Sequence, residues 1–218
     1  SRRRHTRYIS VTGVQTCALP ISLRTSASRV RQNAAVTIEL AREAVAKASR
    51  IVAFTGAGIS TDSGIPDFRG PNGVWTRNPA AEKASSIEYY LSDPEVRRAA
   101  WQTRLHSAAW DARPNAGHLA LLELERSGRL HAVVTQNVDG LHQIAGHDPA
   151  RVQEVHGTMR FSRCWECRER LPMQEVLERV RAGDPEPACL RCGGILKSDT
   201  ILFGQALVPE VIDAALRA

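Results

Sequence analysis

Four cysteines in two close pairs have the spacing in this sequence that most clearly predicts chemistry. Cys164 and Cys167 form one Cys-x-x-Cys pair, and Cys189 and Cys192 form a second pair after 21 intervening residues. Each pair places two thiolates on a tight turn, and two such turns can close a tetrahedral zinc site with Zn–S distances of about 2.3 Å. Four cysteines leave no open coordination position, so this zinc would be structural. Unligated buried cysteines, or a redox function for one pair, are the alternatives.

A glycine-rich segment follows a short apolar run, Ile51–Phe54, that we expect to be a buried parallel strand. A strand that leads into Gly56-x-Gly58 and small hydroxyl residues predicts a tight turn into a helix N-terminus. Backbone N–H groups and the helix dipole suit a pyrophosphate there, and only glycine lets the backbone approach it so closely. Ordinary turn glycines are the alternative, since Gly64 comes later than the third glycine of the usual dinucleotide fingerprint.

Polar residues follow a second apolar run, His131–Thr135, which we also expect to be a buried strand. Gln136, Asn137 and Asp139 come directly after it, at the carboxyl edge of a parallel sheet, where ligands bind in open α/β folds. Helix capping is the alternative function of such residues. His156 is a candidate general base, because histidine alone titrates near neutrality without special tuning.

Four motifs in this order resemble those of sirtuins, the NAD-dependent protein-lysine deacylases. They are Gly56-Ala57-Gly58-Ile59-Ser60 with Ile65-Pro66-Asp67-Phe68-Arg69, then Thr135-Gln136-Asn137-Val138-Asp139-Gly140-Leu141-His142, then Glu154-Val155-His156-Gly157, and the two cysteine pairs. The resemblance covers roughly residues 35 to 210. It implies a bacterial-type member of the family, and we expect the chain to lack the C-terminal part of the sheet that holds the adenosine half of NAD.

The resemblance also implies functional residues. The NAD-binding set would be Gly56, Ala57, Gly58, Ser60, Asp67, Phe68, Arg69, Gln136, Asn137, Val138 and Asp139. Within it, Gln136 and Asn137 would contact the nicotinamide ribose, and Asp139 with the Val138 backbone would hold the carboxamide. Asp67 and Arg69 would anchor the loop and the phosphates, and Phe68 would shield the reacting sugar. A forked guanidinium suits phosphate oxygens, which gives residue 69 a physical reason to be arginine.

His156 and Asn137 would be the catalytic residues, and the other histidines are expected to be structural: His106, His118, His131, His142 and His147. Ile201, Phe203 and Gly204 resemble the segment against which sirtuins align an acyl-lysine peptide by strand addition. The family usually has glutamate after that glycine, where this chain has Gln205.

The function implied by the resemblance is NAD-dependent deacylation of protein lysines, in which NAD is a co-substrate and zinc is structural. The acyl group passes to ADP-ribose and nicotinamide is released. The expected partners are acylated lysine side chains and NAD, without a membrane, and the expected location is the cytoplasm. A mono-ADP-ribosyl transferase on the same scaffold is one alternative. A non-catalytic zinc-ribbon fragment that binds nucleic acid is another.

The elements that position these residues predict an α/β fold with a Rossmann-like parallel sheet. We expect helices over Thr37–Ser49, Pro94–Leu105 and Pro114–Ser127, a return of Thr200–Gly204 to the sheet, and a helix from Pro209. The NAD-binding domain would comprise residues 34–157 and 198–218, with a helical insertion at about 79–111. Residues 158–197 would form the zinc-binding module.

The basic character of the chain is confined to its first residues. The formal net charge is +6, but residues 1–38 contain seven arginines and no acid, which leaves 22 basic against 23 acidic residues elsewhere. The segment 1–33 could be a disordered arm that binds nucleic acid, a targeting peptide or foreign sequence. The apolar runs are far shorter than the roughly 18 residues that span a membrane.

Overall fold

The computed structural model describes residues 38–68, 70–71, 73–77 and 85–218. The chain divides into two compact units, residues 1–41 and 42–218. Of the first unit the structure describes only 38–41, the start of helix α1. The predicted tail 1–33, the cap residue Thr37 and Arg69 therefore lie outside the described residues.

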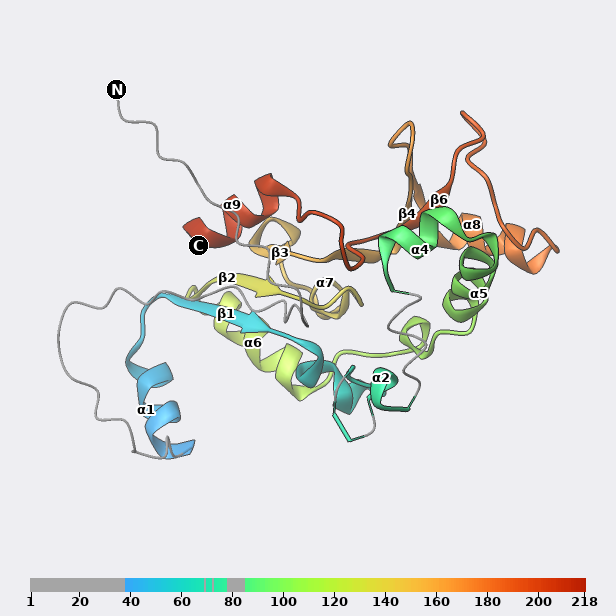
Figure 1. The fold of residues 1–218 in the computed structure, drawn as a ribbon. Helices are drawn as coiled ribbons and strands as arrows, with labels where there is room; N and C mark the ends of the chain where they lie inside the picture. Colours follow the sequence, from blue (N-terminus) through green and yellow to red (C-terminus); the bar gives the residue numbers. More distant parts are fainter. Residues whose placement is uncertain (1–37, 69, 72, 78–84) are drawn as a thin grey trace, which may run out of the picture. The chain divides into compact units, whose positions relative to one another are not determined.

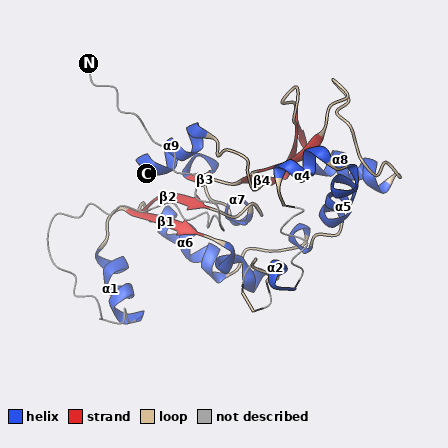
Figure 2. Ribbon diagram, viewed as in Figure 1, coloured by secondary structure: helices blue, strands red, loops and turns tan. Residues whose placement is uncertain are grey.

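The described strands form two separate sheets (Figures 1 and 2). The strands are β1 (Ile51–Thr55), β2 (Leu130–Thr135), β3 (Val152–Glu154), β4 (Gly157–Cys164), β5 (Arg170–Pro172) and β6 (Leu196–Thr200). The α-helices are α1 (Ile38–Lys47), α2 (Val74–Arg77), α4 (Ile87–Ser92), α5 (Pro94–Leu105), α6 (Ala116–Arg126), α7 (Leu141–Ala145), α8 (Met173–Arg181) and α9 (Pro209–Arg217). Short 3-10 helices are η1 (Ala57–Ser63), η2 (Ala108–Trp110) and η3 (Pro149–Arg151). No helix in the described part of the chain is long and apolar enough to cross a membrane.

The first sheet is parallel, in the order β1-β2-β3, and it contains both predicted strands. The expected burial of the first strand is wrong, because Val52 and Phe54 on one face of β1 are 42% and 51% exposed. Leu130, Val133 and Val152 form its buried core, against which Leu121 and Leu124 of α6 pack. Helix α6 begins where Asn115 accepts a hydrogen bond from the backbone N–H of Gly117, which is the expected position for an N-cap. The predicted α/β arrangement with a parallel sheet is confirmed.

The second sheet is antiparallel, in the order β5-β4-β6, and it contains the cysteine segment. The predicted return of Thr200–Gly204 to the first sheet is wrong. Thr200 ends β6, which pairs with β4, and the segment 201–204 is outside the named strands except for a bridge between Phe203 and Ser86. The apolar residues Ile201 to Phe203 resemble a buried strand in sequence, but Phe203 pairs with the helical insertion and Ile201 donates its N–H to the His156 carbonyl.

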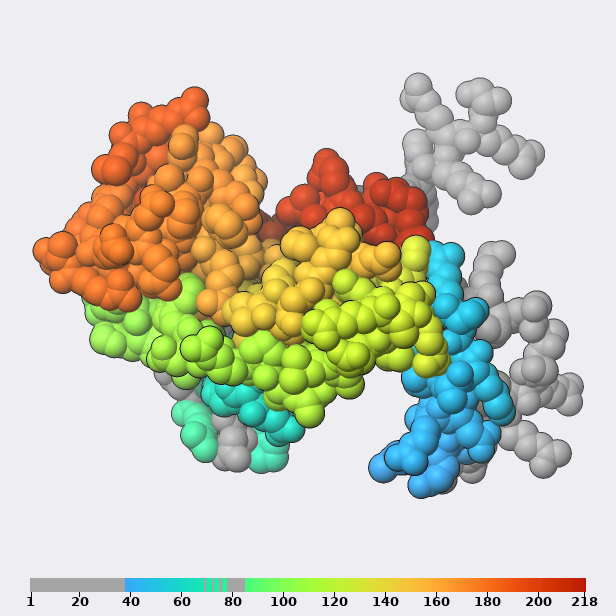
Figure 3. Space-filling model, turned by 180° about the vertical axis from the view of Figure 1, so that it is seen from behind, coloured from blue at the N-terminus to red at the C-terminus, as the bar shows by residue number. Residues whose placement is uncertain are grey.

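The helical insertion and the cysteine segment share one hydrophobic core. Trp101 of α5 is fully buried and packs with Met173, Val176 and Leu177 of α8, and with Cys164. The space-filling view shows the cysteine segment (orange) lying directly against the helices of the insertion (green) (Figure 3). Helix α5 has the predicted bounds. The insertion therefore helps to build the cysteine module.

Candidate functional site

Three of the sequence motifs follow the ends of the three strands of the first sheet, and these strand ends pair with one another. Thr55 of β1 pairs with Thr135 of β2, and Thr135 pairs with Glu154 of β3. The glycine loop follows the first of these residues, Gln136 follows the second, and His156 lies two residues after the third. Because the strands are parallel, all three motifs lie at the carboxyl edge of the sheet, where open α/β folds bind ligands.

The glycine loop passes into a helix, as predicted, and this helix is the 3-10 helix η1 with Gly56 at its N-cap. An ideal Cβ on Gly56 or Gly58 would meet nothing within 4 Å, so the space beside both glycines is open to a ligand. Gly64 has φ +83° and ends η1, with its N–H donated to the carbonyl of Thr61 at 3.0 Å. Its late position in the motif thus reflects the end of the helix, which requires a left-handed residue.

A buried hydrogen-bond network joins the glycine loop to the residues after β2. The Ser60 hydroxyl donates to the Asp139 carboxylate at 2.7 Å, and the Asn137 amide donates to Ser60 Oγ at 3.0 Å and to the Gly56 carbonyl at 3.1 Å. Ser60, Asn137 and Asp139 are at most 9% exposed. Asp139 also accepts the backbone N–H of Leu141 at 2.9 Å, in a turn that precedes α7, whose N-cap is Gly140 without a side-chain cap. The network therefore fixes the glycine loop relative to the segment that follows β2.

The second half of the loop motif is held by its aspartate. Asp67 accepts a hydrogen bond from the backbone N–H of Gly70 at 2.9 Å, and a Cβ on Gly70 would lie 2.2 Å from the same carboxylate. A side chain at residue 70 would therefore displace the Asp67 carboxylate from this position. Phe68 is 47% exposed, and Val138 uses its carbonyl to accept the N–H of Met159 at 2.8 Å.

His156 is half-buried and its ring is oriented by the neighbouring strand. Its Nδ1 lies 3.1 Å from the carbonyl oxygen of Gln136. A carbonyl can only accept, so Nδ1 carries the hydrogen in this contact and Nε2 of the neutral ring keeps its lone pair. The His156 carbonyl accepts the N–H of Ile201 at 2.8 Å, which places the predicted peptide segment beside the histidine.

The backbone of Phe203 is already engaged. Its N–H donates to the Ser85 carbonyl at 2.9 Å, and its carbonyl accepts the N–H of Ile87 at 2.9 Å. Both the N–H and the carbonyl of Phe203 thus form hydrogen bonds with the helical insertion. Gly204 has φ +80° and ends the segment in a turn. A peptide that adds to this segment would have to pair with residues other than Phe203.

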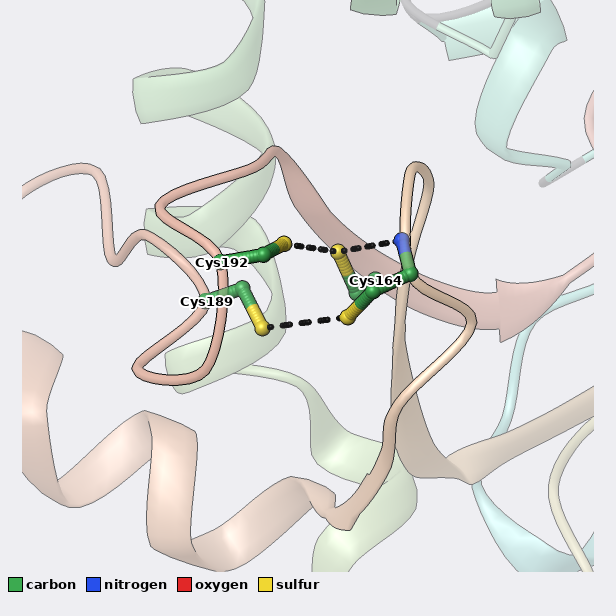
Figure 4. A group of neighbouring side chains, drawn as sticks. Cys164, Cys189 and Cys192 are labelled. Carbon is green, nitrogen blue, oxygen red and sulfur yellow. Dashed lines mark hydrogen bonds between the residues drawn. The ribbon is translucent and has the colours of Figure 1, made fainter.

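The four cysteines form a compact cluster at one end of the second sheet (Figure 4). Cys164 Sγ lies 3.5 Å from Cys192 Sγ, and Cys167 Sγ lies 3.6 Å from Cys189 Sγ, with all four sulfur atoms within 4.8 Å of one another. Tetrahedral zinc with Zn–S of about 2.3 Å requires sulfur atoms about 3.8 Å apart. The cluster fits a closed four-thiolate zinc site, and the redox alternative leaves the second pair unexplained.

Sequence reasoning missed three contributors to this edge. Arg160 donates from Nε to the carbonyl of Asp139 at 2.8 Å, and Asn115 donates to the Ile59 carbonyl at 2.6 Å and to Ser63 Oγ at 2.9 Å. Thr55 donates to Thr135 across the last row of the sheet at 2.8 Å. Only the last of these contacts had a signal in the sequence: Thr55 directly follows the first apolar run and Thr135 ends the second.

Comparisons with known proteins agree on one family. The sequence model of the Sir2 family matches residues 56–218. NAD-dependent protein deacetylase 2 of Streptomyces coelicolor is 53% identical over 165 residues, which cover 76% of this chain and 68% of that protein. The NAD-dependent protein deacetylase of Sulfolobus acidocaldarius is 47% identical over 163 residues, which cover 75% of this chain and 62% of that protein. The chain thus spans about two thirds of the length of these relatives.

Solved structures give the same result. A structure described as a basis for the mechanism and regulation of Sir2 enzymes has a TM-score of 0.70 and 39% identity, and the match covers 81% of this chain and 68% of that one. A Sir2 complex with a p53 peptide and NAD+ has a TM-score of 0.71 and 30% identity, with coverage of 83% and 70%.

The fold and the site define an α/β protein with a Rossmann-like parallel sheet, to which a four-cysteine module is attached. In this chain the glycine loop, the Gln-Asn-x-Asp segment, the histidine after β3 and the cysteine pairs follow one another in that order. The chain belongs to the Sir2 family.

Proposed function

We propose that this chain carries the reaction centre of an NAD-dependent protein-lysine deacetylase. One observation supports the proposal most directly: the glycine loop, Asn137 and His156 leave three adjacent parallel strands at the same edge. A dinucleotide over the loop would then present its ribose to the amide and to the imidazole together. The relatives named as NAD-dependent protein deacetylases, and the Sir2 complexes with NAD+ and peptide, agree with this arrangement.

The NAD-binding residues follow from the same edge. Gly56, Ala57, Gly58 and Ser60 would form the phosphate loop, and the open space beside the two glycines supports this assignment. Both hydrogens of the Asn137 amide are used by Gly56 and Ser60, which leaves its oxygen to accept a ribose hydroxyl.

The remaining assignments are also proposals. Gln136 would contact the ribose, and Asp139 with Val138 would hold the carboxamide. Asp67 and Phe68 would complete the loop, together with Arg69, which lies outside the described residues.

In the proposed reaction the amide oxygen of the acyl-lysine attacks C1′ of the nicotinamide ribose, and the bond to nicotinamide breaks. His156 Nε2 then takes the proton of a ribose hydroxyl, whose oxygen attacks the acyl carbon, and the lysine amine leaves with a proton. A water molecule adds to the same carbon, and the bond from that carbon to the oxygen on C1′ breaks, which leaves the ester. The products are O-acyl-ADP-ribose, nicotinamide and free lysine. The contact between Nδ1 and the Gln136 carbonyl supports Nε2 as the base, because it leaves the lone pair on that atom.

The substrate would be an acylated lysine in an extended protein segment. It would pair with the backbone near Ile201 and Gly204, beside His156. Zinc held by the four cysteines would stabilise the module and take no part in the reaction. We also propose a cytoplasmic location, because the four clustered thiols suit a reducing compartment.

The test is to incubate the chain with NAD and an acetyl-lysine peptide, and to follow both products by mass spectrometry. Loss of the acetyl group with formation of O-acetyl-ADP-ribose would support deacetylation, whereas a peptide that gains ADP-ribose would indicate a transferase. His156→Ala should abolish turnover and keep full zinc content. His131→Ala is the matched control, since His131 is exposed on β2 and away from the edge. Equal activity of the two variants would contradict the proposal.

A further inference from the structure

Three buried histidines lie together beside the cofactor edge, outside the proposed reaction. His118 belongs to α6, His142 to α7, and His147 to the turn after α7, and each is at most 2% exposed. Ring centroids are 4.9 Å apart for His118 and His142, and 5.4 Å apart for His142 and His147. One nitrogen of each ring is buried without a hydrogen-bond partner among the described residues. Because unpaired buried nitrogens are costly, the cluster calls for an explanation.

His142 differs from the other two rings because a chain of hydroxyl groups connects it to the site. Its Nε2 lies 3.0 Å from Thr55 Oγ1, and Thr55 Oγ1 lies 2.8 Å from Thr135 Oγ1. Thr135 Oγ1 accepts the backbone N–H of Asn137 at 3.0 Å. Three hydrogen bonds in sequence thus run from the imidazole, across the last row of the sheet, to the residue that we place on the nicotinamide ribose.

Each atom in this series of hydrogen bonds acts as a donor or as an acceptor. Each threonine hydroxyl has one hydrogen and can rotate, so its direction depends on its neighbours. Thr55 Oγ1 donates its hydrogen to Thr135 Oγ1, so it accepts a hydrogen bond from Nε2–H of His142. Thr135 Oγ1 accepts both the Thr55 hydrogen and the Asn137 N–H. An apolar group in place of Nε2 would leave the Thr55 hydroxyl free to rotate. The hydrogen bond from Thr55 to Thr135, and through it the position of the Asn137 backbone, would then be less well fixed.

The surroundings keep the ring neutral. The pKa of His142 is lowered to about 4, chiefly by burial and also by neighbouring His118 and His147, while the Asp139 carboxylate opposes this shift. His147 pairs through Nδ1 with Glu125 of α6, and His118 accepts the backbone N–H of Asn115 at 3.3 Å. Neither of these two rings contacts the threonines through a hydrogen bond in the described structure.

We propose that His142 is a positioning residue for NAD, acting through Thr55 and Thr135 on the backbone of Asn137. The proposal rests on the proposed function, because it depends on Asn137 as a ligand of the nicotinamide ribose. The ring itself would not touch NAD.

The experiment measures NAD affinity of the full chain by calorimetry for His142→Leu, His142→Gln and Thr55→Val. The loss of one neutral hydrogen bond should raise Kd about 5-fold in His142→Leu and in Thr55→Val. The double variant should be no weaker than either single variant, because both remove the same link. His142→Gln, whose terminal amide can reach the position of Nε2, should restore binding to within about 2-fold of the parent. His147→Gln is the matched control, buried in the same cluster but without a link to the threonines.

Several outcomes would overturn the proposal. An unchanged Kd in both His142→Leu and Thr55→Val, additive losses in the double variant, or a glutamine variant as weak as leucine would each indicate a packing role alone. If His142→Leu does not fold, Thr55→Val and His142→Gln still decide the question. A parent chain that binds no NAD would reject the proposed function as well, whereas a parent that binds and deacetylates with unaffected variants would reject only the role of His142.

Discussion

Gly157 is the position at which one methyl group should do most damage, and the chain contains its own control. Gly157 has φ +72°, and a Cβ there would lie 2.1 Å from the carbonyl oxygen of Asp199 on β6. Gly128 has φ +73°, and a Cβ there would meet nothing within 4 Å. Alanine at either position has the same left-handed backbone cost, but only at residue 157 does it collide with another strand.

The collision at residue 157 has no easy relief. The Asp199 carboxylate accepts hydrogen bonds from Arg163 at 2.6 and 3.0 Å and from Arg170 at 2.8 Å, which holds that part of β6 in place. Separating β4 from β6 would also strain the bond from Ile201 N–H to the His156 carbonyl. The φ cost alone is about 1 kcal/mol, and the loss of one or two backbone hydrogen bonds with their packing adds about 2 kcal/mol.

We therefore expect Gly128→Ala to lower the free energy of unfolding by about 1 kcal/mol and Gly157→Ala by about 3 kcal/mol. For a chain of this size the corresponding drops in Tm are about 3 and 9 °C. Urea unfolding followed by circular dichroism, with zinc content measured in parallel, tests this. If the two variants agree to within about 0.5 kcal/mol, the close approach of β4 and β6 does not control stability and the reasoning is wrong.

Zinc removal by a chelator, or Cys192→Ser, should loosen the core around Trp101, so tryptophan fluorescence should shift as zinc is lost; an unchanged spectrum and Tm would contradict a structural zinc. Burial lowers the pKa of His142 to about 4, below its unfolded value near 6.5, so its contribution to stability is complete above pH 6.5 and is lost as pH falls toward 4. His142→Gln should flatten this dependence in urea unfolding at pH 7 and pH 5, and parallel curves would refute it. Burial raises the pKa of Glu154 to about 7, so its carboxyl group stays protonated to a higher pH in the folded state than in the unfolded state. The free energy of unfolding therefore falls as pH rises from 4.5 to 7. Glu154→Gln should be more favourable at pH 8 than at pH 5, by at most about 3 kcal/mol, and the same effect at both pH values would argue against a buried charge.

The apolar runs Ile51–Phe54 and His131–Thr135 correctly predict two parallel strands, but the buried character expected of both holds only for β2. The sequence predicts the cysteine cluster because ligand spacing is local. The segment 201–204 shows the limit of this reasoning. Its residues suit a strand, but pairing with the helical insertion is a long-range choice that local pattern does not contain.

The candidate site was predictable as a set of motifs, but its internal connections were not. Ser60, Asn137 and Asp139 meet only because two strands lie in register, and no spacing along the chain encodes those contacts. His142 is buried, as expected for a structural histidine, and only the three-dimensional contacts distinguish it from His147. Gly64, by contrast, has a local explanation: it ends η1 in the left-handed backbone conformation, which favours glycine.

Strand β4 connects the first sheet to the cysteine cluster directly. Its first residue follows His156 and its last residue is Cys164, so only seven residues lie between the histidine and the first cysteine. Its pairing with β6 is irregular between Gly157 and Ser162 and regular from Ser162 to Cys164. An insertion near the cysteine end would turn Cys164 to the opposite face and out of the cluster. Between Cys167 and Cys189, strand β5 pairs with β4 and helix α8 packs on Trp101, so both are restrained as well, whereas residues 183–187 lie outside the named helices and strands. Among descendants of this gene, additions should therefore accumulate at 183–187, while β4, β5 and α8 keep their lengths.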